Sequence, residues 1–207
     1  MKKYSVLICI IISLIFLLIA TSLYPGGSID DLDSSGFIWS KNFFSNLFNE
    51  KAINGDPNPS RIWALTGMAF HSIAYGLFFV HSSSKIPQKH AAYVLKFVGI
   101  SNMLFTFLIA TPLHDYMITI SSTLSLLGLF YLTVFILKTN LQFLKAFSIG
   151  SLLLFYYTLY LYGAGDRGLL AVMQKIAFFC FTLLILIIEY FTKSADFQYK
   201  KTEKPEI

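Results

Sequence analysis

The chain has 207 residues, of which 56% are hydrophobic and only 13% are charged, and its formal net charge is +5. A soluble globular domain carries about 25% charged residues, so this composition excludes an ordinary water-exposed surface and indicates an integral membrane protein. The positive charge does not indicate nucleic-acid binding, because the basic residues are scattered along the chain and near its ends. The length suits a single domain.

The first apolar run spans residues 6–23 and follows two lysines. A cleavable signal peptide has a shorter apolar stretch, of about 7–15 residues, and then small residues at the cleavage site. Here the run is longer and ends in Leu23, Tyr24 and Pro25, which make a poor cleavage site. The sequence therefore predicts a retained membrane span that ends where Pro25 and the two glycines after it break the helix.

Residues 24–61 form the only long polar segment between apolar runs. Apolar side chains inside it recur at helical spacing, while polar side chains take the other face. The apolar positions are Ile38, Trp39, Phe43, Phe44, Leu47 and Phe48. We predict a short amphipathic helix at the membrane interface, with Ser34 or Ser35 as its N-cap. A lid that only seals the helix ends is the favoured interpretation of this element. Asn58 and Pro59 predict the start of the next helix.

Five further apolar runs are each long enough to cross a bilayer, which takes about 20 residues. They span residues 62–80, 93–111, 116–137, 146–163 and 169–192. The sequence thus predicts an all-α integral membrane protein, with six transmembrane helices within residues 1–195 and a long outer loop that carries the interfacial helix. Residues 196–207 are expected to form a cytoplasmic tail.

The distribution of lysine and arginine predicts the orientation in the membrane. With both termini cytoplasmic, eleven of the 16 basic residues lie on the inner side and five lie on the outer side. An even number of spans agrees with both termini on one side. We therefore expect a multi-pass protein of the cell membrane, that is the inner or plasma membrane, whose loop of residues 24–61 faces outward.

Polar side chains inside a membrane are costly, and they are candidates for function by default. His71 and Asn102 each lie about nine residues from the outer end of their span, which places them about 14 Å deep. Other polar groups lie closer to the outer surface, and together they predict a polar cavity that opens outward beneath the long loop. The candidate residues are Arg61, His71, Asn102, His114, Asp115, Tyr156, Asp166 and Lys175.

Hydrogen bonding between helices without a cavity is the other interpretation of these polar side chains. It is preferred for Asn102 and evenly balanced against a cavity role for His71. Lys175 is expected either to extend to the outer interface or to pair with Asp115 or Asp166.

His114 and Asp115 are the pair best suited to chemistry, because a histidine beside a carboxylate can act as a base or as a metal ligand. Capping of the next helix is the preferred role for Asp115. No HxxxH, HExxH or CxxC spacing occurs, so no metal site is predicted. Only His71 lies in mid-membrane, so haem is not expected, and no cofactor is predicted. Cys9 and Cys180 are expected to be buried without forming a disulfide.

Three stretches of the outer loop carry a resemblance to a known family. They are the run Tyr24-Pro25-Gly26-Gly27, the run Asn42-Phe43-Phe44-Ser45-Asn46-Leu47, and the run Asn58-Pro59-Ser60 ahead of an aromatic-rich span. With His114 and Asp115 at the outer hairpin, the chain resembles the six-helix prokaryotic membrane family catalogued as domain of unknown function 998. The outer-loop motif residues that follow from this resemblance are Asn42, Ser45, Asn46 and Asn58.

Members of that family often have Ser-Asp-Leu-Gly where this chain has Ser45-Asn46-Leu47-Phe48, so a carboxylate role at position 46 is not carried over. The family is distantly similar to eukaryotic six-helix proteins of the Frag, DRAM and Sfk type, some of which are tied to lipid remodelling or lipid distribution. The resemblance therefore implies a lipid-related role and no sharper activity.

Two functional hypotheses follow, and the sequence favours the first. The first is a lipid-handling protein, whose partner is a membrane lipid bound in the outward-facing cavity. The second is a non-catalytic accessory or scaffold protein that binds a membrane-protein partner through the loop of residues 24–61. A small-molecule transporter is less favoured, because six spans without inverted repeats or broken helices do not match the usual transporter pattern. The sequence itself leaves open whether the protein is an enzyme.

Overall fold

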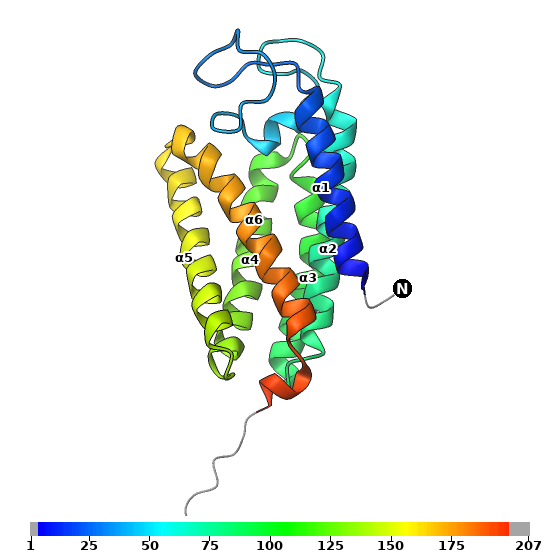
Figure 1. Ribbon diagram of the computed structural model, residues 1–207, viewed down its shortest axis with the longest axis vertical. Coiled ribbons are helices and arrows are strands. Elements are labelled where there is room, and N and C mark those ends of the chain that lie inside the picture. The colour runs from blue at the N-terminus through cyan, green and yellow to red at the C-terminus, as the bar shows by residue number, and fades with distance from the viewer. Residues whose placement is uncertain (1–3, 199–207) are drawn as a thin grey trace, which may run out of the picture.

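The computed structural model describes residues 4–198, and this part of the chain is built from helices (Figure 1). The six long helices are α1 (Ser5–Leu23), α2 (Ser60–Ser83), α3 (Lys89–Leu108), α4 (His114–Leu137), α5 (Gln142–Ala164) and α6 (Arg167–Phe191). Two short 3₁₀ helices, η2 (Phe44–Phe48) and η3 (Ser194–Phe197), complete the described elements. All six long helices are long and apolar enough to cross a membrane, which is the pattern of a multi-pass membrane protein.

The helices form a bundle in which neighbours along the chain are also neighbours in space. The pairs α1–α2 and α2–α3 have the most extensive contacts, and α4 packs on α3. The helix α5 packs mainly on α4 and α6 and stands at one edge, while α6 crosses the front of the bundle obliquely (Figure 1). Because α6 also contacts α2 and α1, it closes the bundle.

Small residues set the close approach of α2 and α3. A Cβ atom built on Gly99 would lie 2.6 Å from the Cβ of Phe79 and 3.0 Å from the carbonyl oxygen of Gly76. A Cβ on Gly76 would in turn lie 3.2 Å from the carbonyl oxygen of Gly99. Membrane helices gain attraction from such close backbone packing, because lipid supplies no hydrophobic driving force between them.

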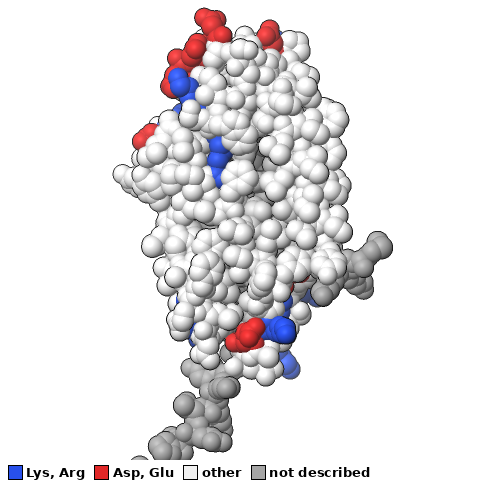
Figure 2. All heavy atoms as spheres, viewed as in Figure 1, with Lys and Arg blue, Asp and Glu red and all other residues white. Residues whose placement is uncertain are grey.

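We call the two ends of the bundle the loop end and the tail end. The loop end carries residues 24–59, the α3–α4 link of residues 109–113 and the α5–α6 link. The tail end carries the start of α1, the α2–α3 and α4–α5 links and η3 (Figure 1). Charged side chains gather near the two ends, and a broad belt that is almost free of charge separates them on the face shown in Figure 2. That distribution is the one expected for a bundle that crosses a bilayer.

The predicted spans match the six helices to within a few residues at most ends. The largest difference is α3, which was predicted at residues 93–111 but runs from Lys89 to Leu108. Residues 109–113 form a tight link instead, in which the Ala110 and His114 amides donate to the carbonyl oxygens of Phe107 and Thr111. The predicted cap role of Asn58 holds in part: its Oδ1 accepts from the Ser60 amide at 3.1 Å, although Pro59 occupies the N-cap position of α2.

The predicted interfacial helix is shorter than expected and begins later in the chain. Only Phe44–Phe48 is helical, as a single 3₁₀ segment, and no helix starts at Ser34 or Ser35. The side chain of Asn42 bonds to two backbone groups of the loop before this segment. Its Oδ1 accepts from the Ile38 amide at 2.8 Å, and its Nδ2 donates to the Gly27 carbonyl at 2.7 Å.

The apolar face of this loop points into the protein. Phe44, Leu47 and Phe48 are buried, and η2 packs on α2. Their periodicity therefore reflects packing on the chain's own helices. The predicted tail of residues 196–207 is also partly revised, because Phe197 is buried in the main core; residues 199–207 lie outside the described part.

Candidate functional site

A polar cavity of about 490 Å³ opens at the loop end of the bundle. Three segments form its wall: η2 with the residues after it, the start of α2, and the α3–α4 link with the start of α4. The lining residues are Ser45, Phe48, Asn49, Glu50, Arg61, Ile109, Ala110, Thr111, Pro112, His114 and Asp115. The cavity therefore brings together Arg61, His114 and Asp115 from the predicted set, and Ser45 from the loop motif.

The α3–α4 link holds one wall of the cavity in place. The Thr111 hydroxyl donates to the carbonyl oxygen of Leu108 at 2.7 Å and accepts from the Leu113 amide at 3.3 Å. These bonds satisfy backbone groups between the end of α3 and the start of α4. His114 and Asp115 are thereby placed in the first turn of α4.

Arg61 stands on the opposite wall, at the start of α2. Its Nη1 lies 2.8 Å from Oε1 of Glu50, and the two side chains are 41% and 79% exposed. An ion pair this exposed contributes at most about 1 kcal/mol, so an anion could compete with Glu50 for the guanidinium. The Nε of Arg61 is buried and has no hydrogen-bond partner among the described residues.

His114 has a defined tautomer in this position. Its Nδ1 lies 2.7 Å from the carbonyl oxygen of Ile109, and since a carbonyl only accepts, Nδ1 carries the hydrogen. The neutral ring then presents Nε2 as an acceptor, while the protonated ring presents it as a donor. His114 can therefore meet either an amine or an anion.

Asp115 does not cap α4, contrary to the preferred sequence interpretation. Leu113 occupies the N-cap position, and no side chain caps it. The side chain of Asp115 is instead exposed and lines the cavity. It still lies in the first turn of α4, where the helix dipole favours a negative charge.

His71 lies outside the cavity. Its ring is 7% exposed and packs between Tyr75, at 4.3 Å between ring centroids, and Phe178, at 4.7 Å. The contact with Phe178 joins α2 to α6. In this structure His71 is a packing residue between two helices, a role that differs from both the cavity role and the interhelical hydrogen bond that the sequence left balanced.

Asn102 follows the preferred interpretation of hydrogen bonding between helices. Its Nδ2 donates to Oγ of Ser125 at 2.7 Å, joining α3 to α4. One turn further along α3, the hydroxyls of Thr106 and Ser121 lie 2.8 Å apart and join the same two helices. Bonds of this kind contribute roughly 0.6 kcal/mol each, so the pair stabilises the α3–α4 contact.

Lys175 pairs with neither Asp115 nor Asp166, and it does not extend to the surface. The side chain is buried on α6, where its Nζ donates to the carbonyl oxygens of Asn42 and, at 2.6 Å, of Ala171. The rings of Phe37 and Phe44 each lie 5.7 Å from Nζ, within the range of a cation–π contact. Lys175 therefore tethers the loop to α6.

The remaining predicted residues lie outside the cavity wall or bond to the protein's own backbone. Tyr156 is half-exposed on α5, and Asp166 caps α6 by accepting from the Leu169 amide at 3.1 Å. In the loop motif, Asn46 accepts from the Phe43 amide at 2.7 Å, and Asn58 donates to the carbonyl oxygen of Asn49 at 2.9 Å. Together with Asn42, these side chains bond to the backbone of the loop that forms one wall of the cavity.

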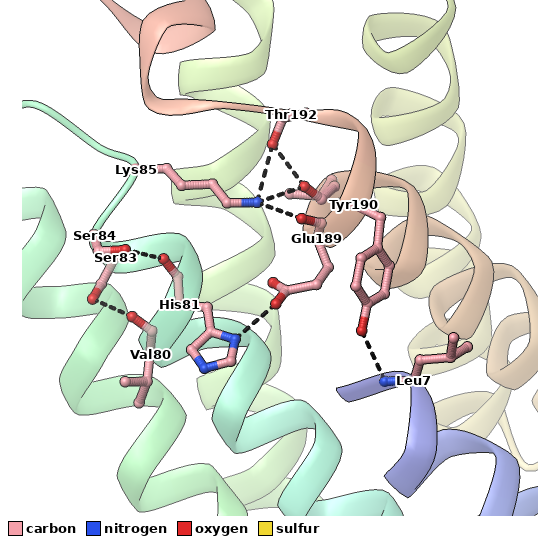
Figure 3. Close-up of polar contacts among 10 residues, drawn as sticks. Leu7, Val80, His81, Ser83, Ser84, Lys85, Glu189, Tyr190 and Thr192 are labelled. Atoms are coloured by element: carbon pink, nitrogen blue, oxygen red, sulfur yellow. Dashed lines mark hydrogen bonds and ion pairs between the residues drawn. The ribbon is translucent and has the colours of Figure 1, made fainter. Parts of the chain in front are cut away.

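Sequence reasoning missed a polar cluster at the tail end, shown in Figure 3. From its position near the end of the last apolar run, Glu189 is expected to reach water or Lys193. In the structure it lies 2.7 Å from His81 instead. Lys85 donates to the carbonyl oxygens of Ile188 and Glu189, both at 2.8 Å, so it caps the end of α6. Burial lowers the pKa of Lys85, and the negative charges of Glu189 and Asp196 oppose this shift.

No sequence motif marks this cluster, because its members come from segments far apart in the chain. The nearest available clue is charge placement, since a carboxylate near the end of an apolar run needs a donor close by. Within residues 4–198, no group of three or more His, Cys, Asp or Glu side chains is placed to hold a metal ion.

Comparison of the chain with protein-family models, with curated proteins and with solved structures finds no match. The resemblance to domain of unknown function 998 therefore stays a prediction. The cavity at the loop end, with the charges that line it, is the feature from which a function can be argued.

Proposed function

We propose that the protein binds the headgroup of a membrane lipid in the loop-end cavity. The observation that carries this proposal is a cavity of about 490 Å³ that contains Arg61 and His114 at the end of membrane-spanning helices. Ligand pockets in proteins commonly measure about 300–1,000 Å³, so the size suits a headgroup with part of its glycerol region.

The position of the cavity favours a lipid over a water-soluble ligand. The cavity lies where α2 and α4 begin and α3 ends, which is the level at which headgroups meet a membrane protein. Exposed apolar side chains surround this level, namely Ile62 at 65%, Leu113 at 50% and Tyr116 at 75% exposure. Such side chains would contact the hydrocarbon of a lipid whose headgroup occupies the cavity.

The loop supports binding by holding the cavity in shape before a ligand arrives. Asn42 is fully buried and Asn58 nearly so, and each bonds to backbone groups at more than one point of the loop. A preformed site loses less conformational entropy on binding. The buried asparagines of the loop motif therefore hold the loop in shape, and Ser45 belongs to the binding site.

We further propose that the loop end faces outward and both termini face the cytoplasm of the cell, with the protein in the inner or plasma membrane. The excess of lysine and arginine on the tail-end side supports this orientation. A lipid would then enter from the outer leaflet.

The second hypothesis, a scaffold that binds a partner protein through the loop, has weaker support. It rests on the aromatic face from Phe37 to Phe48, and most of that face is occupied by the chain's own helices. Phe44, Leu47 and Phe48 are buried, and the ring of Phe44 packs on Phe178 of α6. Only Trp39, at 43% exposure, remains a large exposed side chain in that stretch.

Native mass spectrometry of the detergent-purified protein tests the proposal. The wild type should retain a defined phospholipid, and Arg61→Gln should lose most of it, because the guanidinium is the permanent positive charge in the cavity. Asp33→Asn, an exposed acid elsewhere in the loop, is the control and should retain lipid as the wild type does. Equal retention by all three proteins would count against the cavity, and no retained lipid in any of them would count against lipid binding.

A further inference from the structure

We propose that the bound headgroup is a zwitterion carrying a primary amine, as in a phosphoethanolamine lipid. This inference rests on the proposed function and names the lipid class that the loop-end cavity would take. It comes from the balance of charges and of hydrogen-bonding groups around the cavity.

The cavity holds charges of both signs. Glu50 and Asp115 contribute two carboxylates, Arg61 contributes one guanidinium, and His114 contributes an imidazole. With neutral His114 the four side chains sum to a net charge of about −1, and with protonated His114 they sum to about zero. A purely anionic headgroup would therefore meet two carboxylates and only one permanent cation. A headgroup with one phosphate and one ammonium can pair with both kinds of group.

The acceptors suit an ammonium with N–H donors. A primary ammonium has three donors, and the cavity offers the carboxylates of Glu50 and Asp115 together with Nε2 of neutral His114. The carboxylate of Asp115 lines the cavity, and its two oxygens offer about four lone-pair sites. These groups line one continuous cavity from the loop to the start of α4.

A quaternary ammonium, as in choline, fits this cavity less well. It has no N–H donor, and proteins recognise it with a cage of several aromatic rings. Phe48 is the only aromatic side chain among the residues that line the cavity. The carboxylates and the imidazole would then be left without donors from the ligand, so amine and choline headgroups should be distinguished.

The phosphate has its own set of donors. Arg61 lines the cavity, and its bond to Glu50 is exposed enough to be exchanged. Ser45 and Asn49 line the same cavity and supply a hydroxyl and a side-chain amide. Once an ammonium pairs with Glu50, the guanidinium is released to the phosphate, so the two halves of a zwitterion favour each other's binding.

The experiment measures headgroup preference directly. The detergent-purified full chain is titrated separately with dihexanoyl phosphatidylethanolamine, phosphatidylcholine and phosphatidylglycerol, and binding is followed by native mass spectrometry. We expect the ethanolamine lipid to bind about tenfold more tightly than either of the others, because charge-assisted hydrogen bonds distinguish them. The double variant Glu50→Gln with Asp115→Asn should lose the preference for ethanolamine over choline. Asp33→Asn is the matched control and should keep it.

Arg61→Gln separates the inference from the proposed function. It should weaken binding of all three lipids, since all three carry a phosphate, and Arg61→Lys should recover part of the loss. Equal binding of the three lipids by the wild type, or tighter binding of phosphatidylglycerol, would overturn the amine inference and leave headgroup binding intact. Absence of binding by any of them would overturn both. Glu50 and Asp115 are exposed, so their amide variants are expected to fold; a thermal melt matching the wild type confirms that a lost preference comes from the cavity.

Discussion

Replacing Asn42 by alanine should open the loop without unfolding the bundle. The side chain is fully buried, and its two hydrogen bonds, 2.8 Å from the Ile38 amide and 2.7 Å to the Gly27 carbonyl, join positions far apart in the loop. Alanine removes both and leaves two backbone groups without partners. Each lost bond costs about 1 kcal/mol when its backbone group can reach water and up to about 2 kcal/mol when it stays buried. The two together give about 2–4 kcal/mol.

Hydrogen exchange measures this change where it occurs. A loss of about 2–4 kcal/mol corresponds to faster exchange by roughly 30-fold to several hundred-fold in the loop amides. Amides in the middle of α2 and α3 should be unaffected. Asn54→Ala is the control, because Asn54 is exposed and its side chain bonds only to neighbouring Asp56. Unchanged loop protection in Asn42→Ala, or an equal effect of Asn54→Ala, would refute the view that buried asparagine bonds hold the loop.

Three further substitutions test the packing and the tail-end cluster. Gly99→Ala should lower thermal stability by about 1–3 kcal/mol through overpacking between α2 and α3. Gly150→Ala should leave stability unchanged, because no atom lies within 4 Å of the added carbon. Equal melting temperatures of the two variants would contradict the close packing. His81→Ala should lower stability by about 1–3 kcal/mol, because it removes the partner of the Glu189 carboxylate, whose side chain is 8% exposed. As a control, the exposed His90→Ala should change stability by less than about 0.5 kcal/mol. Matching denaturation curves would argue against the His81–Glu189 ion pair. Since the folded-state pKa of Lys85 is lowered by burial, its contribution to stability is present above its ordinary pKa and is lost as the pH falls through the folded value. Wild type should therefore gain stability relative to Lys85→Met as the pH is raised toward 10.5, and a difference that does not vary with pH would contradict this.

The length of the apolar runs predicts the six helices, because the thickness of the hydrocarbon layer requires about 20 apolar residues per span. The prediction is less accurate at helix ends, where the apolar run and the helix do not end at the same residue. The helix α3 includes Lys89 and His90, which resemble a loop, and ends at Leu108, although the link that follows contains Ile109 and Leu113. Helices extend into the polar interface, and tight links can be apolar. Hydropathy therefore places helices more accurately than it places their ends.

The loop shows what local periodicity misses. Phe43, Phe44, Leu47 and Phe48 follow a helical spacing, yet the backbone is set by Asn42, whose partner Gly27 lies 15 residues earlier. A long-range bond of this kind overrides local propensity. The asparagines of the loop motif were singled out from the sequence, but only the structure shows that they bond to the loop's own backbone.

The site was predicted in part, and the reason lies in helix geometry. Depth along a span follows from counting residues, so Arg61, His114 and Asp115 were correctly grouped at one end. The rotation of each helix about its axis depends on packing, which the sequence does not state. His71 and Lys175 therefore appeared to share the cavity, while the structure turns them toward Phe178 and Asn42.

The most direct test of a lipid in the loop-end cavity is photocrosslinking in intact membranes. A photoreactive amino acid is placed at Ser45, which lines the cavity, and for comparison at exposed Asp33 in the same loop. After illumination, mass spectrometry of the purified protein should find a phospholipid attached at position 45, and ethanolamine should be its headgroup, with little attached at position 33. A protein partner at position 45, or equal lipid labelling at both positions, would contradict the account.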